Sequence, residues 1–560
     1  MVRFSTLVAL AVVALAEPAL SAPRAVVHGK AKDTSFSGGS EFSSVSSKHG
    51  SLVRPAPAAA AKPVGDVVPG EEKAVAVFMP ARKAKEGDWR RINIINATPY
   101  KFVRKSMHEY QIEDWPHSWP KYIEPGQVHE SVSKMYGGHH RKDTGAEVTY
   151  EIEGTCEKMS FEIIYNKERA ELPTVRVQFK GGLKTRWTPK GSEIELTRRV
   201  VWGGVNFLLA GTEDDFYSMD GPTGWMQEQI KDIGDYPLNE IVMPRSHHAG
   251  MNQGRTGVGI VYDETTLTQT KSPYEQMKVG GARVLDFRPY LRTGRMFSAG
   301  HFSKIAGLHH GMIGINLKEI IDDINRFLDE NPGEMIILDF HDKESWMGFT
   351  EPKFGEVNEE WRRLLWKELA RLNHRFSLPD DVMNIHKMTL NDFVGDGQST
   401  VLIHVPDPWI WDKHFPGAHE GYVSNRNFPR TGYWSDTEQG ETLVAEQGAT
   451  IQQKKSNGRG GQIHDAQWVL RLATVQYVFP VLPIWKLARE AWGRLYVGMW
   501  SAINDEKYPN WISFDAFETE EAKILAMTMN RCLVAGKCGK LGGKAPSAES
   551  LELKCAKKDD

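Results

Sequence analysis

The feature that most constrains the fold of this chain is an alternation of short apolar runs with helical patterns after Gly211. Runs that are apolar along their whole length fit strands buried on both faces, and helices between them favour a parallel sheet. The apolar runs lie at 238–243, 282–287, 335–340, 400–405 and 511–517, and the helical patterns lie at 272–279, 316–328, 357–372, 467–475 and 520–532. This pattern over 225–535 predicts an α/β fold, a single (β/α) barrel of the TIM type.

A different pattern precedes the barrel, over residues 88–212. The segments EVTYEIE and TVRVQFK alternate apolar and polar residues, which gives each predicted strand one apolar face. Turn residues separate the predicted strands, which lie at 91–95, 147–152, 160–165, 174–179 and 193–196. We therefore expect a smaller all-β domain here, an antiparallel β-sandwich.

The N-terminal residues 1–22 have the layout of a secretory signal peptide. Arg3 precedes the apolar run Leu7–Ala16, and the small residues Ser21 and Ala22 suit cleavage. The run is too short to span a bilayer, so we expect a secreted, extracellular protein. Residues 23–87 are rich in Ala, Ser, Pro and Gly and are predicted to form a disordered linker, and 536–560 to form a polar tail.

The charge balance and the cysteines exclude two classes of site. Of 560 residues, 69 are basic and 72 acidic, and this balance gives no overall field that would hold nucleic acid. Four cysteines fit an oxidising compartment, with three pairings open; Cys532 with Cys538 or with Cys555 would make a tail staple, and Cys156 stands apart. None has the short paired spacing of a zinc site, so we expect no structural metal.

Polar residues suited to phosphate chemistry follow several predicted strands. Histidine transfers protons near neutral pH, arginine supplies a fixed charge for phosphate, and a carboxylate can orient a histidine. These residues are His247 and His248 after IVMPRS, Asp286 and Arg288 in VLDFR, His309 and His310 in GLHHG, and Asp515 at the end of WISFD. Because barrel chemistry lies at the carboxyl ends of strands, the set predicts cleavage of a phosphodiester by acid-base catalysis.

The same motifs resemble a known family. MPRSHHAGMN, YEQMKVGGARVLDFRPY and GLHHGMIGINLKEIIDDINRFLDENPGEMIILDFHD, over about 235–345, are similar to the X domain of phosphatidylinositol-specific phospholipases C, especially secreted microbial and fungal members. PNWISFDAFETEEAKILAMTMN near 509–530 resembles the closing strand and helix of that domain. The preceding sandwich looks like the accessory β-module of fungal proteins of this kind. The resemblance implies a TIM-type barrel and a phospholipid substrate.

The resemblance also implies catalytic roles for five residues. His247 corresponds to the general base that activates the inositol 2-hydroxyl, and His310 to the general acid that protonates the leaving diacylglycerol oxygen. Asp515 corresponds to the carboxylate that orients His247. Arg288 matches the arginine that replaces calcium in metal-independent members, and Asp286 would position it. The implied product is a cyclic inositol phosphate, formed without a cofactor or a metal ion.

Three further histidines are expected to contact the substrate. His248 stands where many relatives have Asp or Asn, and His341 stands where they place a lysine, glutamate or asparagine. His404 is the candidate for a later strand-end residue that grips substrate. Pro244-Arg245-Ser246 replaces the usual Pro-Gly-Thr or Pro-Gly-Ser. Aromatic residues in the C-terminal half fit either a peripheral membrane-contacting rim or the packing of long loops, and they are Trp409, Trp411, Tyr433 and Trp434.

Two other functions fit the same sequence. One is a metal-dependent phosphodiesterase of the same fold that acts on another lipid, although such sites need Glu and Asp ligands. The other is a secreted binding protein with a catalytically degenerate barrel, a reading that His248 and Arg245 favour.

Overall fold

The structure is a computed structural model of the chain. It describes residues 89–135, 145–166, 174–197, 204–259, 261–292, 296–305, 308–340, 359–379, 383–406, 420–454, 461–473, 482–539, 541 and 555. The predicted signal peptide and linker, His341, Trp409, Trp411 and most of the predicted tail lie outside the described residues. The predicted boundaries of the β domain and the barrel stay predictions.

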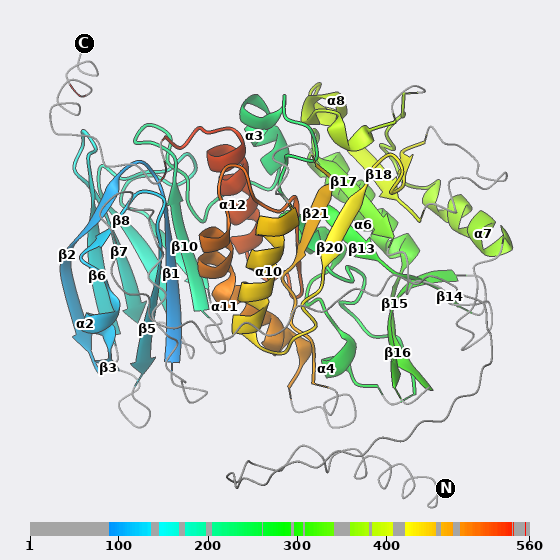
Figure 1. The fold of residues 1–560 in the computed structure, drawn as a ribbon, viewed down its shortest axis with the longest axis horizontal. Coiled ribbons are helices and arrows are strands. Elements are labelled where there is room, and N and C mark those ends of the chain that lie inside the picture. The colour runs from blue at the N-terminus through cyan, green and yellow to red at the C-terminus, as the bar shows by residue number, and fades with distance from the viewer. Residues whose placement is uncertain are drawn as a thin grey trace, which may run out of the picture. The chain divides into compact units, whose positions relative to one another are not determined.

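Eight parallel strands form the sheet that carries the candidate site (Figure 1). In chain order they are β11 (Met243–Ser246), β13 (Val284–Phe287), β17 (Met335–Phe340), β18 (Thr400–His404), β19 (Tyr422–Val423), β20 (Arg430–Tyr433), β21 (Ile463–Gln467) and β22 (Trp511–Phe514). Neighbours in the chain are neighbours in the sheet, and the last strand, β22, pairs with the first, β11. In the described part of the chain, β19 and β20 form the two edges of the sheet and are not paired with each other, so the ring of strands is open between them. This strand order is that of a TIM-like α/β barrel, open at one seam.

One barrel helix, α3 (Trp225–Ile233), precedes the first of these strands, and the other barrel helices lie between or after them. These are α4 (Asp263–Thr266), α5 (Pro273–Lys278), α6 (Leu317–Glu330), α7 (Glu359–Leu369), α8 (Leu390–Val394), α10 (Gly440–Lys454), α11 (Ile484–Ala502) and α12 (Glu521–Thr528), which continues as a π-helical turn, Met529–Val534. A short 3-10 helix spans Ile385–Lys387. Apolar side chains of α6 that recur at helical spacing, such as Ile320, Ile324 and Phe327, are fully buried in the barrel core.

A separate antiparallel sheet is formed by one strand from the segment after β11 and three strands from the segment between β13 and α6. Its strands are β12 (Thr256–Val258), β14 (Pro289–Arg292), β15 (Met296–Ile305) and β16 (Leu308–Asn316), in the order β12-β16-β15-β14. The described part of the GLHHG segment, residues 308–311, is thus part of a hairpin strand, and the prediction that it follows a barrel strand is wrong. Residues 300–305 of β15 pair one by one with residues 313–308 of β16, and this hairpin is an addition that the barrel pattern does not predict.

The N-terminal module consists of two sheets. One contains β1 (Trp89–Ala97), β3 (Ile112–Glu113), β5 (Val128–Met135) and β10 (Gly204–Ala210). The other contains β2 (Lys101–Tyr110), β4 (Tyr122–Ile123), β6 (Gly145–Glu153), β7 (Met159–Asn166), β8 (Thr174–Gly181) and β9 (Glu193–Thr197), and a short helix, α2, spans Trp115–Ser118. Phe161 of β7 contacts Phe207 of β10 in a shared apolar core. The pairing of β1 with β10 is parallel, which differs from the antiparallel arrangement expected throughout.

Two predicted elements of the barrel are wrong. The helix expected at 467–475 is not helical through residue 473. Residues 463–467 form β21, and the irregular segment that follows buries Trp468, Val469, Leu470 and Leu472. The strand expected at 238–243 is displaced, since β11 begins at Met243. In both places a short apolar run is buried without forming the predicted element, because burial alone does not specify a strand or a helix.

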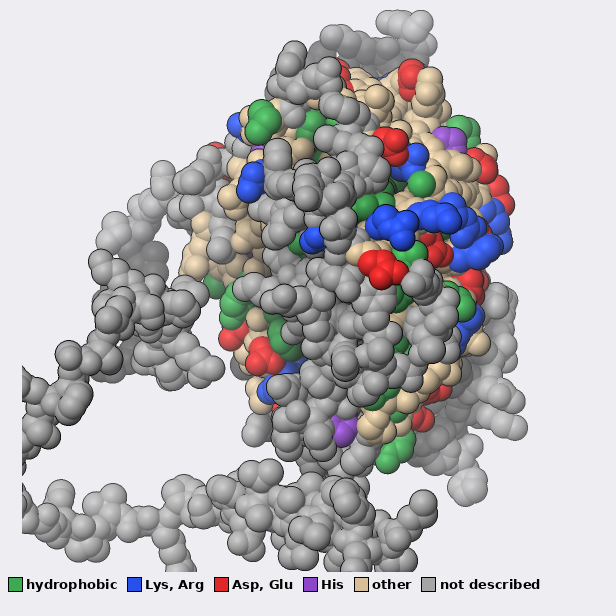
Figure 2. Space-filling model, turned by 90° about the vertical axis from the view of Figure 1, so that its right-hand side faces the viewer, with side chains coloured by type: hydrophobic (Ala, Val, Ile, Leu, Met, Phe, Trp, Pro, Cys, Tyr) green, Lys and Arg blue, Asp and Glu red, His purple; other side chains and the backbone are tan. Residues whose placement is uncertain are grey.

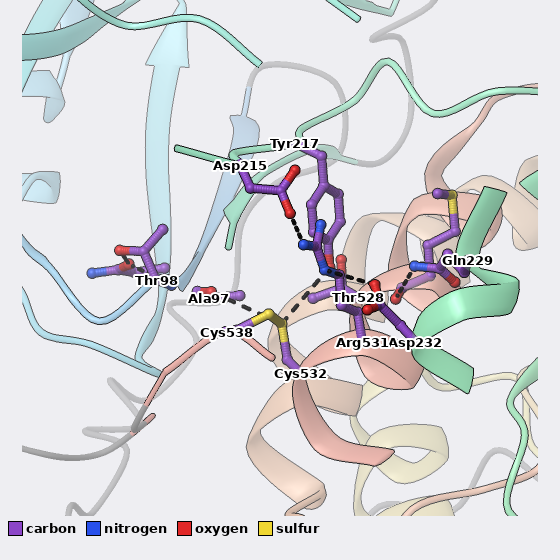
Figure 3. Close-up of a disulfide and its surroundings, with 12 residues drawn as sticks. Ala97, Thr98, Asp215, Tyr217, Gln229, Asp232, Thr528, Arg531, Cys532 and Cys538 are labelled. Atoms are coloured by element: carbon purple, nitrogen blue, oxygen red, sulfur yellow. Dashed lines mark hydrogen bonds and ion pairs between the residues drawn. A yellow bond between two sulfur atoms is a disulfide. The ribbon is translucent and has the colours of Figure 1, made fainter. Parts of the chain in front are cut away.

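The β module and the barrel share a buried interface. Figure 1 shows α10, α11 and α12 between β1 and β10 of the module and the barrel strands β20 and β21, and α11 packs against both β1 and β10. Beside Ala97 of the module, Arg531 at the end of the last helix pairs with Asp215 and lies 5.4 Å from the ring of Tyr217 (Figure 3).

Both pairs of cysteines form disulfides. Cys532 pairs with Cys538, within six residues of the chain, and this bridge lies beside the Arg531 contacts in Figure 3. Cys156 of the β module pairs with Cys555, 399 residues away. The second bridge ties the end of the chain to the module, a connection that spacing alone left open.

Among the described helices, none has the length and apolar character needed to cross a bilayer. The face drawn in Figure 2 carries both signs of charge, with a group of Lys and Arg side chains close to acidic ones. Its described side chains therefore do not form a uniformly basic surface.

Candidate active site

His247 and Asp515 form a hydrogen-bonded pair at the carboxyl ends of two neighbouring strands. β11 and β22 pair in parallel with Ser246 opposite Phe514. The residues that directly follow the two strands, His247 and Asp515, therefore lie side by side. His247 Nδ1 lies 2.7 Å from Asp515 Oδ1. Because a carboxylate oxygen only accepts, Nδ1 carries the proton and Nε2 has the free lone pair. Asp515 is buried and His247 is partly exposed, so the pair has one open side.

Arg288 faces the other nitrogen of His247. Its Nη2 lies 3.4 Å from His247 Nε2 and 3.5 Å from Asp286 Oδ2. Asp286 lies near the carboxyl end of β13 next to β11, and its carboxylate also accepts the backbone N–H of His248 at 3.1 Å. Four predicted site residues, together with His248, are therefore brought into one continuous group.

Arg245 lies beneath this group, inside the barrel. It is 1 % exposed, and its guanidinium lies 3.3 Å from Asp286, 2.6 Å from Asp339 and 3.6 Å from Asp465. Burial alone would lower the pKa of Arg245, but the three carboxylates together raise it. Arg245 thus stays charged and supports Asp286 from below. Sequence reasoning treated it as a departure from a glycine and missed this contact.

His404 lies on the other side of Arg245, at the end of β18. Its Nδ1 is 2.9 Å from Asp339 Oδ1, and Arg430 Nε is 3.2 Å from the same oxygen. Burial would raise the pKa of Asp339, but Arg430, Arg245 and His404 hold it well below its usual range. Within the described residues, His404 Nε2 has no hydrogen-bond partner. A second Asp-His pair therefore faces the barrel interior, and it is connected to the first through Arg245, Asp286 and Arg288.

His248 and His301 pack against each other beside His247. The ring centroids of His247 and His248 are 4.3 Å apart, and those of His248 and His301 are also 4.3 Å apart. His248 has a φ of 46°, a left-handed conformation that is unusual for a residue with a side chain. His301 Nδ1 donates to the carbonyl of Thr266 at 2.7 Å, and burial lowers the pKa of His301 to about 4.

His301 was missed by sequence reasoning because it belongs to the unexpected hairpin. The segment MFSAGHFSKI does not alternate apolar and polar residues with a period of two, so only its pairing with β16 reveals the strand.

His310 lies on the same hairpin, two residue pairs closer to the turn than His301. It pairs with Ser303 in the strand register, and His301 pairs with Met312, so His301 and His310 are diagonal neighbours on one face. Side chains in this relation lie about 7–8 Å apart. The expected general acid therefore comes from the added sheet, whereas the expected base comes from the barrel sheet.

Three of these residues could hold a metal ion. Ligand atoms of His247, His248 and Asp286 all lie within 4.8 Å of one another. The guanidinium of Arg288 lies close to two of the three, so a cation already occupies that position in the described geometry. A metal ion would have to displace it.

Comparisons with known proteins find matches only among solved structures. No family model matches the chain, and no curated protein matches it. One structure of the phosphatidylinositol-specific phospholipase C of Staphylococcus aureus is 16% identical, covering 55% of this chain and 97% of that one with a TM-score of 0.41. A mutant of the same enzyme is also 16% identical, covering 58% and 98% with a TM-score of 0.38. At this level of similarity, the reaction has to be inferred from the site itself.

Proposed function

We propose that this chain is a secreted phosphodiesterase that cleaves the inositol phosphodiester of a phosphatidylinositol-like phospholipid without a metal ion. The observation that carries the proposal is the contact series Asp515, His247, Arg288, which joins an oriented imidazole to a fixed positive charge. The sequence motifs around these residues support the choice of an inositol lipid. The β module would be the accessory sandwich that the sequence predicts.

The first half of the reaction would use His247. Asp515 holds the Nδ1 proton, so Nε2 takes the proton of the substrate 2-hydroxyl while the oxygen attacks phosphorus. Arg288 beside Nε2 would donate to a nonbridging phosphate oxygen and offset the charge that develops there. Asp286 holds Arg288 in place and is itself held by Arg245.

The second half would use the hairpin. His310 would give its proton to the diacylglycerol oxygen as the bond from phosphorus to that oxygen breaks, leaving a cyclic inositol phosphate. His248 and His404 would bind substrate hydroxyls, and the Nε2 of His404 offers a buried group for this purpose. Tyr433 and Trp434, exposed at 38% and 51%, would contribute to peripheral membrane contact.

The test is turnover of phosphatidylinositol vesicles, with cyclic inositol phosphate measured by phosphorus NMR. We expect turnover to persist in excess chelator, and to fall by about 100-fold or more in His247→Ala and in His310→Ala. His374→Ala is the matched control, because His374 pairs with Asp329 at 2.9 Å on the surface and should leave turnover unchanged. Full turnover in both site variants would refute the proposal.

The ligand atoms of His247, His248 and Asp286 favour a metal-dependent phosphodiesterase as the second candidate. In that case chelator would abolish turnover and a divalent transition metal would restore it. A protein that binds the vesicles without turning over lipid under any condition would instead be the degenerate binding protein.

A further inference from the structure

The segment that carries Asp515 has an unusual backbone. Ala516, the next residue, has a φ of 53°, in the left-handed region that residues with a side chain rarely adopt. Its N–H donates to the carbonyl of Thr268 at 2.8 Å. The side-chain oxygen of Gln269 accepts the backbone N–H of Phe517 at 3.2 Å. The side-chain nitrogen of Gln269 donates to the carbonyl of His247 at 2.7 Å and to that of Phe514 at 3.1 Å. The position of Asp515 thus depends on the contacts that neighbouring residues make with this turn.

Trp492 of α11 contacts the same segment on both sides of Asp515. Its ring stacks on Phe514 with centroids 4.4 Å apart and planes at 17°, and it meets the ring of Phe517 edge-on at 6.0 Å. Its indole Nε1–H donates to the backbone carbonyl of Asp515 at 2.9 Å. Trp492 is only 7% exposed, so both its ring and its N–H are committed to this turn.

The other side of α11 is attached to the β module through two asparagines. Asn206 Nδ2 donates to the carbonyl of Trp492 at 3.1 Å, and Asn93 Nδ2 donates to the carbonyl of Gly493 at 2.6 Å. The two side chains also bond to each other at 2.8 Å, and both are fully buried. Buried polar groups of this kind are costly when unpaired, so they specify where the helix lies.

We propose that Trp492 is a positioning residue for Asp515, and that the β module takes part in the site by fixing α11 through Asn93 and Asn206. The inference rests on the proposed function, in which Asp515 orients His247. The module's asparagines hold the backbone of Trp492, its indole holds the turn of Asp515, and Asp515 orients His247. The β module is then a structural part of the active site as well as an accessory domain.

The consequence is a loss of turnover without a loss of substrate binding. Small displacements of a catalytic group cost large factors in rate. In Trp492→Phe, which keeps an aromatic ring but lacks the N–H donor, we expect kcat to fall about tenfold, with KM within about twofold of wild type. Trp485→Phe is the matched control on the same helix, since Trp485 is partly buried beneath Arg489 and Lys486.

A double-mutant cycle separates positioning from general stability. If Trp492 acts through Asp515, the variant that combines Trp492→Phe with Asp515→Asn should be no slower than Asp515→Asn alone. If the fold-reductions of kcat in the two single variants multiply in the double variant, the inference is wrong. An unchanged kcat in Trp492→Phe would also overturn it. Asn206→Ala keeps the test available if Trp492→Phe does not fold, and it is expected to lower kcat in the same way.

Nuclear magnetic resonance of histidine labelled with nitrogen-15 gives a readout that does not depend on turnover. The Nδ1–H signal of His247 is assigned by its loss in His247→Ala. We expect it to shift in Trp492→Phe and to stay in place in Trp485→Phe. If the wild-type protein does not turn over phosphatidylinositol, the proposed function alone is refuted. If the His247 Nδ1–H signal does not shift in Trp492→Phe, the positioning role alone is refuted.

Discussion

Glu521 at the start of α12 makes stability depend on pH in a direction opposite to that of most carboxylates. Its Oε1 accepts the backbone and side-chain N–H groups of Asn206 at 3.2 and 2.9 Å, and its Oε2 accepts the Thr519 hydroxyl at 2.9 Å. These bonds favour the charged form, but burial is the larger effect and raises the pKa of Glu521 from 4.5 to about 7. The folded state therefore holds this proton more tightly than the unfolded chain does.

The magnitude follows from linkage. Below pH 4.5 both states are protonated and the contribution to stability is complete; as pH rises through 4.5 to about 7, the unfolded chain loses its proton first and the contribution is lost. One pKa unit corresponds to about 1.4 kcal/mol, so the difference amounts to about 3 kcal/mol. Glu521→Gln keeps the shape and carries no charge, so it should remove this dependence.

The assay is equilibrium unfolding by urea at several pH values between 5 and 8. We expect Glu521→Gln to gain stability over wild type as pH rises, by about 3 kcal/mol at pH 8. The control is Glu438→Gln, because Glu438 is exposed and its neutralisation should leave the pH dependence as in wild type. A variant at Glu521 with the same pH dependence as wild type would refute the reasoning.

Three further predictions concern the barrel and the disulfides. The lowered pKa of His301, about 4, means that stability is lost as pH falls from 6.5 towards 4; His301→Asn, measured by unfolding across that range, should reduce this loss by about 3 kcal/mol. Arg245→Met leaves three buried carboxylates without their shared cation, and urea unfolding should show a loss of about 3–5 kcal/mol; a neutral result would mean that water reaches them. Replacing Cys156 and Cys555 by Ser should cost about 2–5 kcal/mol, and reducing agent should then have less effect on the variant than on wild type.

Several parts of the candidate site could be predicted from the sequence because they depend on where residues lie along the chain relative to the strands. Residues that directly follow neighbouring parallel strands must meet at one edge of the sheet, which brings His247 next to Asp515 and places Asp286 beside them. The runs at 335–340 and 400–405 were recognisable as strands because they are short and mostly apolar, with Asp339 and His404 near their carboxyl ends.

Other parts depend on contacts between residues far apart in the chain. Arg245 reads as a misplaced charge until three carboxylates from three other strands surround it. His301 and His310 lie on a hairpin whose pairing, not its composition, places them on one face. The helix expected at 467–475 is absent through residue 473 because the backbone N–H groups of Trp468 and Arg471 bond to the distant carbonyls of Ser513 and Thr437, and the apolar run itself did not reveal these partners.

The amino-acid sequence by itself determined several barrel strands with the helices between them, the chemical groups at the ends of these strands and the apolar faces that must be buried, since these follow from spacing along the chain. Only the tertiary structure decided which charges neutralise one another in the barrel, which cysteines pair and how Trp492 connects the β module to Asp515. The physical reason is that a buried charge or amide is stable only when a distant segment supplies its partner, and periodicity does not encode that partner.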